Sequence, residues 1–244
     1  MLYLHGPKTK IYLTCGFIFL FLFFSHALSA QRVLNLENHD NKPYYFGITL
    51  STASGRLNTS LHSHFLGQDT ILVAEPLNSP GFALGLLATT RLSNRFEGRF
   101  NPELMFIDRS ISYKLRYADP ESGNHVIQKV ESVIVTLPLQ VKFNSDRIGN
   151  FRVYMLGGGK IDYDLASNAQ ARKAEDLIKL QKTDYGIEAG LGFNFYFQSF
   201  ILSPEIKVSN GLSNIHARDE NLKYSSVLDR IQSRMIVFSI HIEG

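Results

Sequence analysis

Residues 185–197 alternate strictly between two kinds of side chain, and this pattern limits the fold more than any other feature. One set of positions is apolar or aromatic and the other is small or polar: Tyr185, Ile187, Ala189, Leu191, Phe193, Phe195 and Phe197 against Gly186, Glu188, Gly190, Gly192, Asn194 and Tyr196. A period of two residues indicates a β-strand. The segment exceeds the usual strand length of roughly 5–6 residues and reaches the roughly 9–11 residues that a tilted strand needs to cross a bilayer. Because spanning strands exist only in closed barrels, this segment predicts a transmembrane β-barrel.

Seven further segments alternate in the same way, with varying strength. They lie near residues 44–53, 81–92, 95–108, 130–143, 151–160, 200–209 and 232–243. The connections are short at 93–94, 144–150 and 198–199, and long near 54–79, 109–128, 161–183 and 211–229. Short turns at one end and long loops at the other are typical of outer-membrane barrels. The sequence therefore predicts an all-β fold, an eight-stranded antiparallel up-and-down transmembrane β-barrel, with both termini on the periplasmic, short-turn side.

Alternation alone does not say which face of the sheet is inside, since a soluble lipocalin-like barrel also alternates but lines its cavity with the apolar face. The polar face here carries both signs of charge: Arg99, Glu103, Glu188, Glu205 and Lys207. Such groups can pair inside a barrel and are costly in lipid. Aromatic residues lie near the strand ends on the other face, as interfacial girdles require. We therefore expect lipid outside and a polar, side-chain-filled interior without a sizeable pore.

The first 30 residues have the pattern of a secretory signal peptide. Lys8 and Lys10 precede an apolar run, Ile11 to Phe24, and small residues follow at 25–30. Removal of the two lysines lowers the formal charge from +3 to about +1, so the charge gives no argument for nucleic acid. Cys15, the single cysteine, leaves with this segment. The predicted organisation is a signal peptide at 1–30, a periplasmic lead-in at 31–43 and the barrel at 44–244.

Three prolines oppose a regular barrel. Pro102, Pro138 and Pro204 all lie within predicted strands, where each removes a hydrogen-bond donor from the ladder. A closed barrel has no edge strand to hold them, so we expect bulges or shifted strand boundaries at these positions.

Two pairs of histidine and serine residues raise the question of catalysis or metal binding. His62, Ser63 and His64 fall in the first long loop, where two histidines without a third ligand are a weak metal pattern. Ser239 and His241 resemble the pair of barrel enzymes that trim lipid A, but they lie near the periplasmic end of the last strand and no carboxylate is evident beside them. We interpret His62, Ser63 and His64 as part of a solvated loop, and His241 as a structural histidine.

Two further groups have structural interpretations. Gly157–Gly159 lacks the ending and the helix of a phosphate-binding loop, so it predicts a thinned strand. Glu188 and Glu205 could be a catalytic carboxylate pair, but an interior salt-bridge network is the better interpretation. The sequence therefore predicts no catalytic, cofactor-binding or metal-binding residue.

The third long loop contains a stretch with helical spacing. Between Asn168 and Lys182 the apolar residues recur at helical intervals among charged ones, and Asn168 is a suitable N-cap. A short amphipathic helix here would either dock a partner or pack on the rim of its own barrel. The sequence leaves both alternatives open.

Several strings resemble the Bacteroidetes-type outer-membrane β-barrel family. They are Tyr45–Ile48, Val135–Phe143 and Gly186–Phe193, and the loop layout is most similar to PorT-type members. This resemblance implies a non-enzymatic component needed for protein export by the type IX secretion system, linked to gliding motility in some relatives. It implies outer-membrane lipid and other secretion-system proteins as partners, and no cofactor. The ending Ile242-Glu243-Gly244 departs from general outer-membrane practice because it lacks a terminal aromatic residue. The alternatives are a barrel enzyme that modifies lipid A or another lipid, and a soluble lipocalin-like binder.

Overall fold

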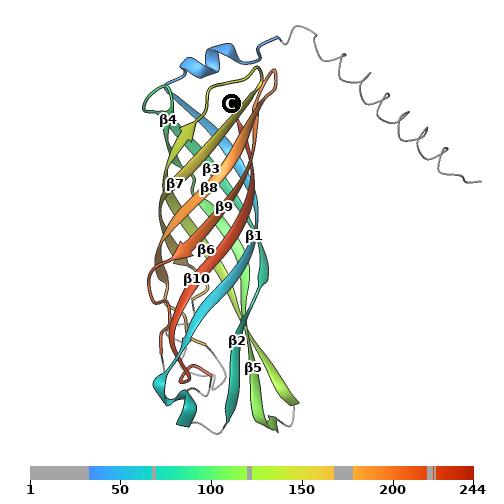
Figure 1. Cartoon of the computed structure of the whole chain (residues 1–244), viewed down its shortest axis with the longest axis vertical. Helices are drawn as coiled ribbons and strands as arrows, with labels where there is room; N and C mark the ends of the chain where they lie inside the picture. The colour runs from blue at the N-terminus through green and yellow to red at the C-terminus, as the bar shows by residue number, and fades with distance from the viewer. Residues whose placement is uncertain (1–32, 68–69, 120–122, 168–177, 219–221, 223) are drawn as a thin grey trace, which may run out of the picture. The chain divides into compact units, whose positions relative to one another are not determined.

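A computed structural model describes residues 33–67, 70–119, 123–167, 178–218, 222 and 224–244 (Figure 1). The predicted signal peptide and residues 168–177 of the predicted loop helix lie outside this described part. The chain divides into two compact units, and the second, residues 35–244, holds every element described below. Its short 3₁₀ helices are η2 (Glu37–Asn41) and η3 (Ser63–Gly67). No helix in the described ranges is long and apolar enough to span a bilayer.

Ten strands form one antiparallel sheet, which confirms the all-β prediction. They are β1 (Tyr44–Leu61), β2 (Ile71–Leu77), β3 (Ser79–Arg91), β4 (Phe96–Phe100), β5 (Glu103–Asp119), β6 (Gly123–Asn144), β7 (Phe151–Asp164), β8 (Thr183–Tyr196), β9 (Ile201–Gly211) and β10 (Leu228–Glu243). From β6 to β10 each strand pairs with the next one along the chain, and β1 pairs with both β10 and β3. β3 and β6 each pair with both β4 and β5.

The sheet has ten strands where the sequence predicts eight because the predicted strand near 95–108 is interrupted and because β2 forms within the predicted loop near 54–79. Asn78 separates β2 from β3, and Asn101 and Pro102 separate β4 from β5. β4 and β5 contact the same two neighbours one after the other, so the interruption divides one stretch of sheet without changing its neighbours.

The other two prolines lie where pairing to one neighbour lapses. Pro138 faces the interruption between β4 and β5, whose pairing with β6 skips Leu137 and Pro138. Pro204 lies between the β8–β9 pairs Gly192–Glu205 and Phe195–Leu202. Both prolines keep their register with the strand on the other side. Each proline thus lacks its N–H group on the side where no partner residue is paired with it, and neither position needs the predicted bulge.

Most strands extend beyond their predicted ends, always at the end where long loops were expected. The predicted loops near 54–79 and 109–128 are largely strand, formed by the ends of β1 and β5, by β2 and by the start of β6. The alternation continues there with opposite polarity. In β1 the outward positions change from Leu50 to Arg56, and the inward positions change from Thr49 to Leu57. A search for apolar residues on one constant face therefore ends each strand too early.

The outward face near Tyr44 and the C-terminus is a band of exposed apolar side chains, here called the apolar band. It includes Tyr44, Phe46, Ile48, Leu50, Phe82, Leu84, Leu86, Leu139, Val141, Tyr185, Ile187, Leu191, Phe193, Ile206, Ile236, Phe238, Ile240 and Ile242. Behind it the sheet encloses buried charged and polar side chains. This is the opposite of the arrangement in a water-soluble protein.

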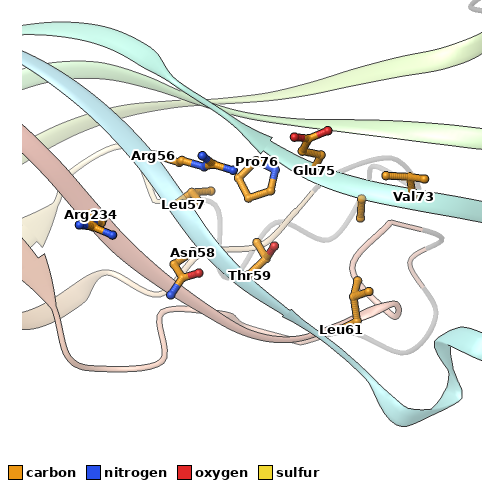
Figure 2. A pocket seen from close by; sticks show the side chains of 10 residues that line it. Arg56, Leu57, Asn58, Thr59, Leu61, Val73, Glu75, Pro76 and Arg234 are labelled. Carbon is orange, nitrogen blue, oxygen red and sulfur yellow. The ribbon is translucent and has the colours of Figure 1, made fainter.

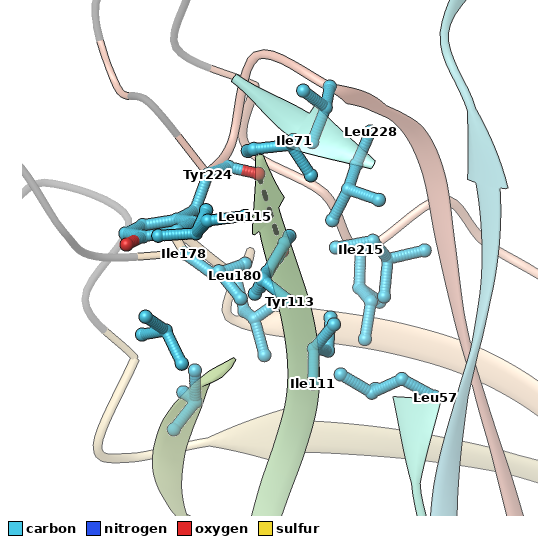
Figure 3. Close-up of a cluster of buried hydrophobic side chains, with 14 residues drawn as sticks. Leu57, Ile71, Ile111, Tyr113, Leu115, Ile178, Leu180, Ile215, Tyr224 and Leu228 are labelled. Atoms are coloured by element: carbon cyan, nitrogen blue, oxygen red, sulfur yellow. Dashed lines mark hydrogen bonds between the residues drawn. The ribbon is translucent and has the colours of Figure 1, made fainter. Parts of the chain in front are cut away.

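The other end of the sheet is organised in the ordinary way. Its interior is a cluster of buried apolar side chains, here called the apolar cap (Figure 3): Leu57, Ile71, Ile111, Tyr113, Leu115, Val126, Val130, Ile178, Leu180, Ile215, Tyr224, Val227, Leu228 and Ile231. A smaller layer lies between the cap and the charged interior: Ala53, Ala83, Met105, Ile107, Ile134, Met235 and Val237. Strand ends and loops thus share one hydrophobic core.

Candidate functional site: a polar network inside the sheet

Arg99 of β4 lies at the centre of a connected network of buried charges. The Arg99 side chain is fully buried, and it donates from Nη1 to Glu205 Oε2 at 2.7 Å and from Nη2 to Glu243 Oε1 at 3.4 Å. Tyr154 donates its hydroxyl to the same Glu205 oxygen at 2.8 Å. Glu205 lies on β9 and Glu243 on β10, so one guanidinium joins strands from separate parts of the sheet.

A second part of the network surrounds Lys207 of β9. Its ammonium group lies 3.2 Å from Glu103 of β5 and 3.6 Å from Glu188 of β8. Each of these two carboxylates also accepts a hydrogen bond from a neutral amide. Gln140 donates to Glu188 Oε2 at 2.7 Å, and Asn101 donates to Glu103 Oε1 at 2.5 Å. Each carboxylate therefore has both a cation and a neutral donor, as a buried charge requires.

A third part lies at the terminal end of the interior. The Lys142 ammonium is 3.6 Å from Glu97 and 4.1 Å from the centre of the Tyr154 ring. Tyr45 donates its hydroxyl to Glu97 at 2.9 Å, and Arg91 lies 3.5 Å from the same carboxylate. The tyrosine ring shared by Lys142 and Arg99 links this part to the centre of the network.

The contacts cross the space enclosed by the sheet. Arg99 and Glu205 lie on β4 and β9, which are separated by β6, β7 and β8 in the order of the sheet. Glu103 and Lys207 lie on β5 and β9, which are likewise separated by β6, β7 and β8 because β5 also pairs directly with β6. The curved sheet brings these side chains together. Two cavities of about 510 and 450 Å³ have no residue of this network in their lining.

Glu188 and Glu205 do not form a carboxylate pair. In the β8–β9 register Glu188 is opposite Ser209 and Glu205 is opposite Gly192, and Lys207 lies between the two carboxylates along β9. Their nearest cations differ, because Glu188 faces Lys207 and Glu205 faces Arg99. The interpretation of both residues as parts of an interior salt-bridge network agrees with these contacts.

His241 has a carboxylate beside it, contrary to the sequence analysis. Its Nε2 lies 3.4 Å from Glu205 and its Nδ1 lies 2.8 Å from Thr49 Oγ1, whereas Ser239 contacts Ser51 at 2.9 Å. Glu205, His241 and Thr49 thus have the order of an acid, a base and a nucleophile. All three are buried, and Thr49 donates its hydroxyl proton to Asn101 at 2.8 Å. The hydroxyl is neither accessible nor free to lose its proton to His241.

The remaining candidates from the sequence have structural positions. Gly157–Gly159 lies within β7, and a Cβ atom on Gly158 would come within 2.2 Å of the Leu139 carbonyl oxygen, so close strand packing explains this glycine. His62 precedes η3 and donates its backbone N–H to Val227. In the third long loop, Ile178 and Leu180 pack in the apolar cap and are not helical. The described residues contain no cluster of His, Cys, Asp or Glu suited to a metal ion.

A polar cluster lies at the terminal end of the sheet, and no motif in the sequence predicts it. Arg147, in the turn between β6 and β7, lies 2.9 Å from Asp40 and stacks on Tyr196 with its guanidinium 3.7 Å from the ring centre. Arg152 lies 3.2 Å from the same carboxylate. Asn35 donates its side-chain amide to the Tyr196 carbonyl at 3.0 Å. Asn35 and Asp40 of the predicted lead-in therefore contact the turn between β6 and β7 and the adjoining ends of β7 and β8.

Two histidines outside the spanning region have low pKa values. His39 in η2 lies 4.6 Å from the Tyr45 ring, and burial, reinforced by Lys42, lowers its pKa. His216 at the cap lies 2.8 Å from Ser225 through Nε2, and burial is the main cause that lowers its pKa. Both rings are held neutral at the two ends of the sheet.

Comparisons with solved structures give matches at low identity. OprG from Pseudomonas aeruginosa is 13% identical, with 82% of this chain and 93% of that chain covered and a TM-score of 0.48. Neisserial surface protein A is 11% identical, with 81% and 96% covered and a TM-score of 0.41. Ail from Yersinia pestis is 10% identical, with 83% and 100% covered and a TM-score of 0.33.

A family model gives the stronger result. No curated protein matches the sequence. Residues 30–217, more than half of the chain, match the model described as outer membrane protein beta-barrel domain. This match agrees with the antiparallel sheet, its exposed apolar band and its polar interior. The chain therefore belongs to the outer membrane protein β-barrel domain family, which indicates a location in the outer membrane.

Proposed function

We propose that the ten strands form eight positions of a closed barrel that is plugged by its own side chains. Two observations support closure at eight: β1 pairs with both β10 and β3, and β4 and β5 occupy one position between β3 and β6. In this arrangement β2 continues the position of β3. An interior of this size holds side chains but no channel, which is consistent with contacts from Arg99 to Glu205 across the interior.

The proposed orientation places both termini and the polar cluster around Arg147 in the periplasm. The apolar cap then lies outside the cell, beyond the apolar band. This assignment is supported by the short turns at the terminal end, which are typical of the periplasmic side of such barrels. It also assumes that the segment at 1–30 directs export and is removed.

The proposed function is a non-enzymatic contribution to protein export by the type IX secretion system. The observation that carries the non-enzymatic part is the buried network, in which the charged groups and His241 face one another and not a cleft. Tyr45–Ile48, Val135–Phe143 and Gly186–Phe193 resemble the Bacteroidetes-type outer-membrane β-barrel family. The connection to export rests on the length of the chain, its layout and its predicted long loops, which are most similar to PorT-type members of that family. A plugged barrel would act through its outer cap, its periplasmic turns, or both.

Deletion of the gene followed by analysis of the secretome tests the export role. Proteins that carry type IX sorting domains should be lost from the cell surface and the medium, and should accumulate in the periplasm. Complementation with the wild-type chain should restore them. Unchanged export in the deletion strain would refute the role.

The alternative is a lipid-modifying enzyme. One observation favours it: His241 contacts Glu205 on one side and Thr49 on the other. Mass spectrometry of lipid A from the deletion strain tests it, and we expect no change in mass. The soluble lipocalin-like alternative requires a polar outer face in contact with water, and the exposed apolar band argues against it. Membrane fractionation should recover the protein with the outer membrane, and its band on gels should shift on heating.

A further inference from the structure

The wall of the sheet opens at one position on the cap side. β1 and β3 pair as far as Gly55 and Ser79. Beyond that point β1 pairs with β10, and β2 pairs with β5. A cavity of about 510 Å³ lies between the separated strands, and its lining includes Arg56, Asn58, Thr59, Val73, Pro76 and Arg234 (Figure 2). The cavity is open to the outside and has Leu57 of the apolar cap in its wall.

Two arginines that line this cavity are register partners on adjacent strands, and neither has a compensating charge among the described residues. Arg56 of β1 and Arg234 of β10 are direct partners in the antiparallel register, and both side chains are exposed. Like charges directly opposite each other destabilise a strand pair. Within the described part of the chain, no carboxylate forms an ion pair with either guanidinium, including Glu75 on the opposite wall. The pair is therefore suited to an anion supplied from outside the chain.

The apolar band begins at the next outward position after Arg234 on β10, and three outward positions from Arg56 on β1. Ile236 and Phe238 follow Arg234 at alternate, outward positions of β10, and Leu50 and Ile48 lie outward on β1. Successive outward residues are about 7 Å apart along a strand. A molecule that fits this surface has an anionic head beside the arginines and apolar chains along the band, and the planar guanidinium matches phosphate in two-pronged contacts.

We infer that Arg56 and Arg234 bind the phosphate of a phosphorylated outer-leaflet lipid of the lipid A type. Its head lies at the cavity between β1 and β2, and its acyl chains lie along Leu50, Ile236 and Phe238. The choice of leaflet rests on the proposed orientation, with the cap outside the cell. An additional strand from a protein partner would use the free edge of β1 but would leave the two guanidinium groups uncompensated, so the lipid accounts for more of the arrangement.

The experiment is native mass spectrometry of the mature full-length barrel in a nonionic detergent. The lipids are bis-phosphorylated lipid A, the same lipid without phosphates, and phosphatidylglycerol. The test variant is Arg56→Gln with Arg234→Gln, and a second variant, Arg56→Lys with Arg234→Lys, keeps the charge. The control is Lys114→Gln with Lys129→Gln, which removes two exposed cations from β5 and β6 at the same end of the sheet. Heat-modifiable gel mobility reports folding of every variant.

The glutamine pair should weaken binding of phosphorylated lipid A about tenfold, as loss of charge-assisted contacts to one phosphate implies. The lysine pair should retain most of the binding, and the control should bind as the wild type does. Wild-type protein should bind the dephosphorylated lipid as weakly as the glutamine pair binds lipid A.

Equal binding by the wild type and a folded glutamine pair would overturn the inference, and so would an arginine-dependent preference for phosphatidylglycerol. Orientation is tested separately with Asn214→Cys in the loop before β10, which an impermeant thiol reagent should label on intact cells. An export defect, or its absence, in the deletion strain has no effect on these binding measurements, so failure of the two proposals can be told apart.

Discussion

The two halves of the sheet place polar and apolar side chains in opposite ways. Near the termini, Arg99, Glu205 and Lys207 are inside and residues such as Leu139 are outside, 69% exposed. At the cap, Ile111 and Leu228 are inside at 0% exposure and Arg56 is outside. The same strands run through both halves, so the secondary structure does not explain the reversal. The surroundings explain it: lipid is the solvent of one half and water that of the other.

The reversal also changes what holds each half together. Lipid around the apolar band supplies no hydrophobic gain for burying apolar groups inside, and the interior there is held by ion pairs and hydrogen bonds. Such a network is stable only when each member has its partner. The cap excludes water from apolar side chains, and its stability depends on packing. The following predictions test this difference, from the largest expected effect to the smallest.

The largest loss of stability should come from Arg99→Met in the polar network. The change leaves Glu205 and Glu243 without their guanidinium, and an uncompensated buried charge costs about 3–5 kcal/mol. Urea unfolding in lipid vesicles measures the change in the free energy of unfolding. Arg95→Met is the matched control, because Arg95 forms an exposed ion pair with Asp146 at 3.0 Å and such pairs contribute roughly 0–1 kcal/mol. Equal effects of the two changes would contradict the role given to the network.

In the cap, Ile111→Ala should cost about 2–5 kcal/mol, because it leaves a cavity in a packed apolar core. The control is Ile127→Ala on the outward face of β6, where the side chain is 54% exposed. The same unfolding measurement compares the two. A loss confined to the cap, seen as faster proteolysis of the outer loops with the spanning strands intact, would show that the two halves unfold separately.

A methyl group added on the inward face of β7 should lower the free energy of unfolding more than one added on its outward face. Gly158→Ala places Cβ within 2.2 Å of the Leu139 carbonyl oxygen, a backbone atom that cannot move alone. Gly157→Ala, one residue earlier on the opposite face, meets nothing nearer than 3.8 Å. We expect Gly158→Ala to destabilise the barrel by about 1–3 kcal/mol and Gly157→Ala to have little effect. Refolding yield into vesicles and urea midpoints give the comparison.

Acidification should weaken both ends of the molecule. Burial lowers the pKa of His39 and His216 in the folded chain, so the unfolded chain takes up protons first as the pH falls. Their contribution to stability is complete above the unfolded pKa of about 6.5 and is lost as the pH falls toward the folded pKa. The rate of loop proteolysis should rise as the pH is lowered from 7.5 to 5. His216→Gln should remove the part of this rise that comes from the cap. An unchanged pH profile in His216→Gln would show that this histidine does not contribute.

The sequence predicted the faces of the spanning strands because lipid imposes one simple pattern on them. Leu139, Ile187 and Phe238 are outward and Arg99, Glu188 and Lys207 are inward, as the alternation requires. It did not predict the ends of β1, β2 and β5, where water reverses the pattern without a change of period. To predict these strand ends from the sequence, one would search for period-two alternation regardless of whether the apolar residues lie on the outward or the inward face.

The partners within the interior could not be read from the sequence. His241 lies beside Glu205 because β9 and β10 pair with Glu205 opposite Ser239, and a shift of register by two residues would remove the contact. Arg99 meets Glu205 only because the sheet curves through β6, β7 and β8. Register and curvature depend on the whole sheet, whereas the face of a residue depends on its own strand.

The depth of outward residues on β1 tests the reversal of polarity most directly. A bimane label is attached through Leu50→Cys or Asn58→Cys in the mature protein. The single cysteine of the sequence, Cys15, lies in the predicted signal peptide, so the introduced cysteine is the one that reacts. In vesicles, brominated lipid should quench the label at position 50 and aqueous iodide should quench it at position 58. Quenching of both positions by lipid alone, or of both by iodide alone, would contradict the division of the sheet into a half in lipid and a half in water.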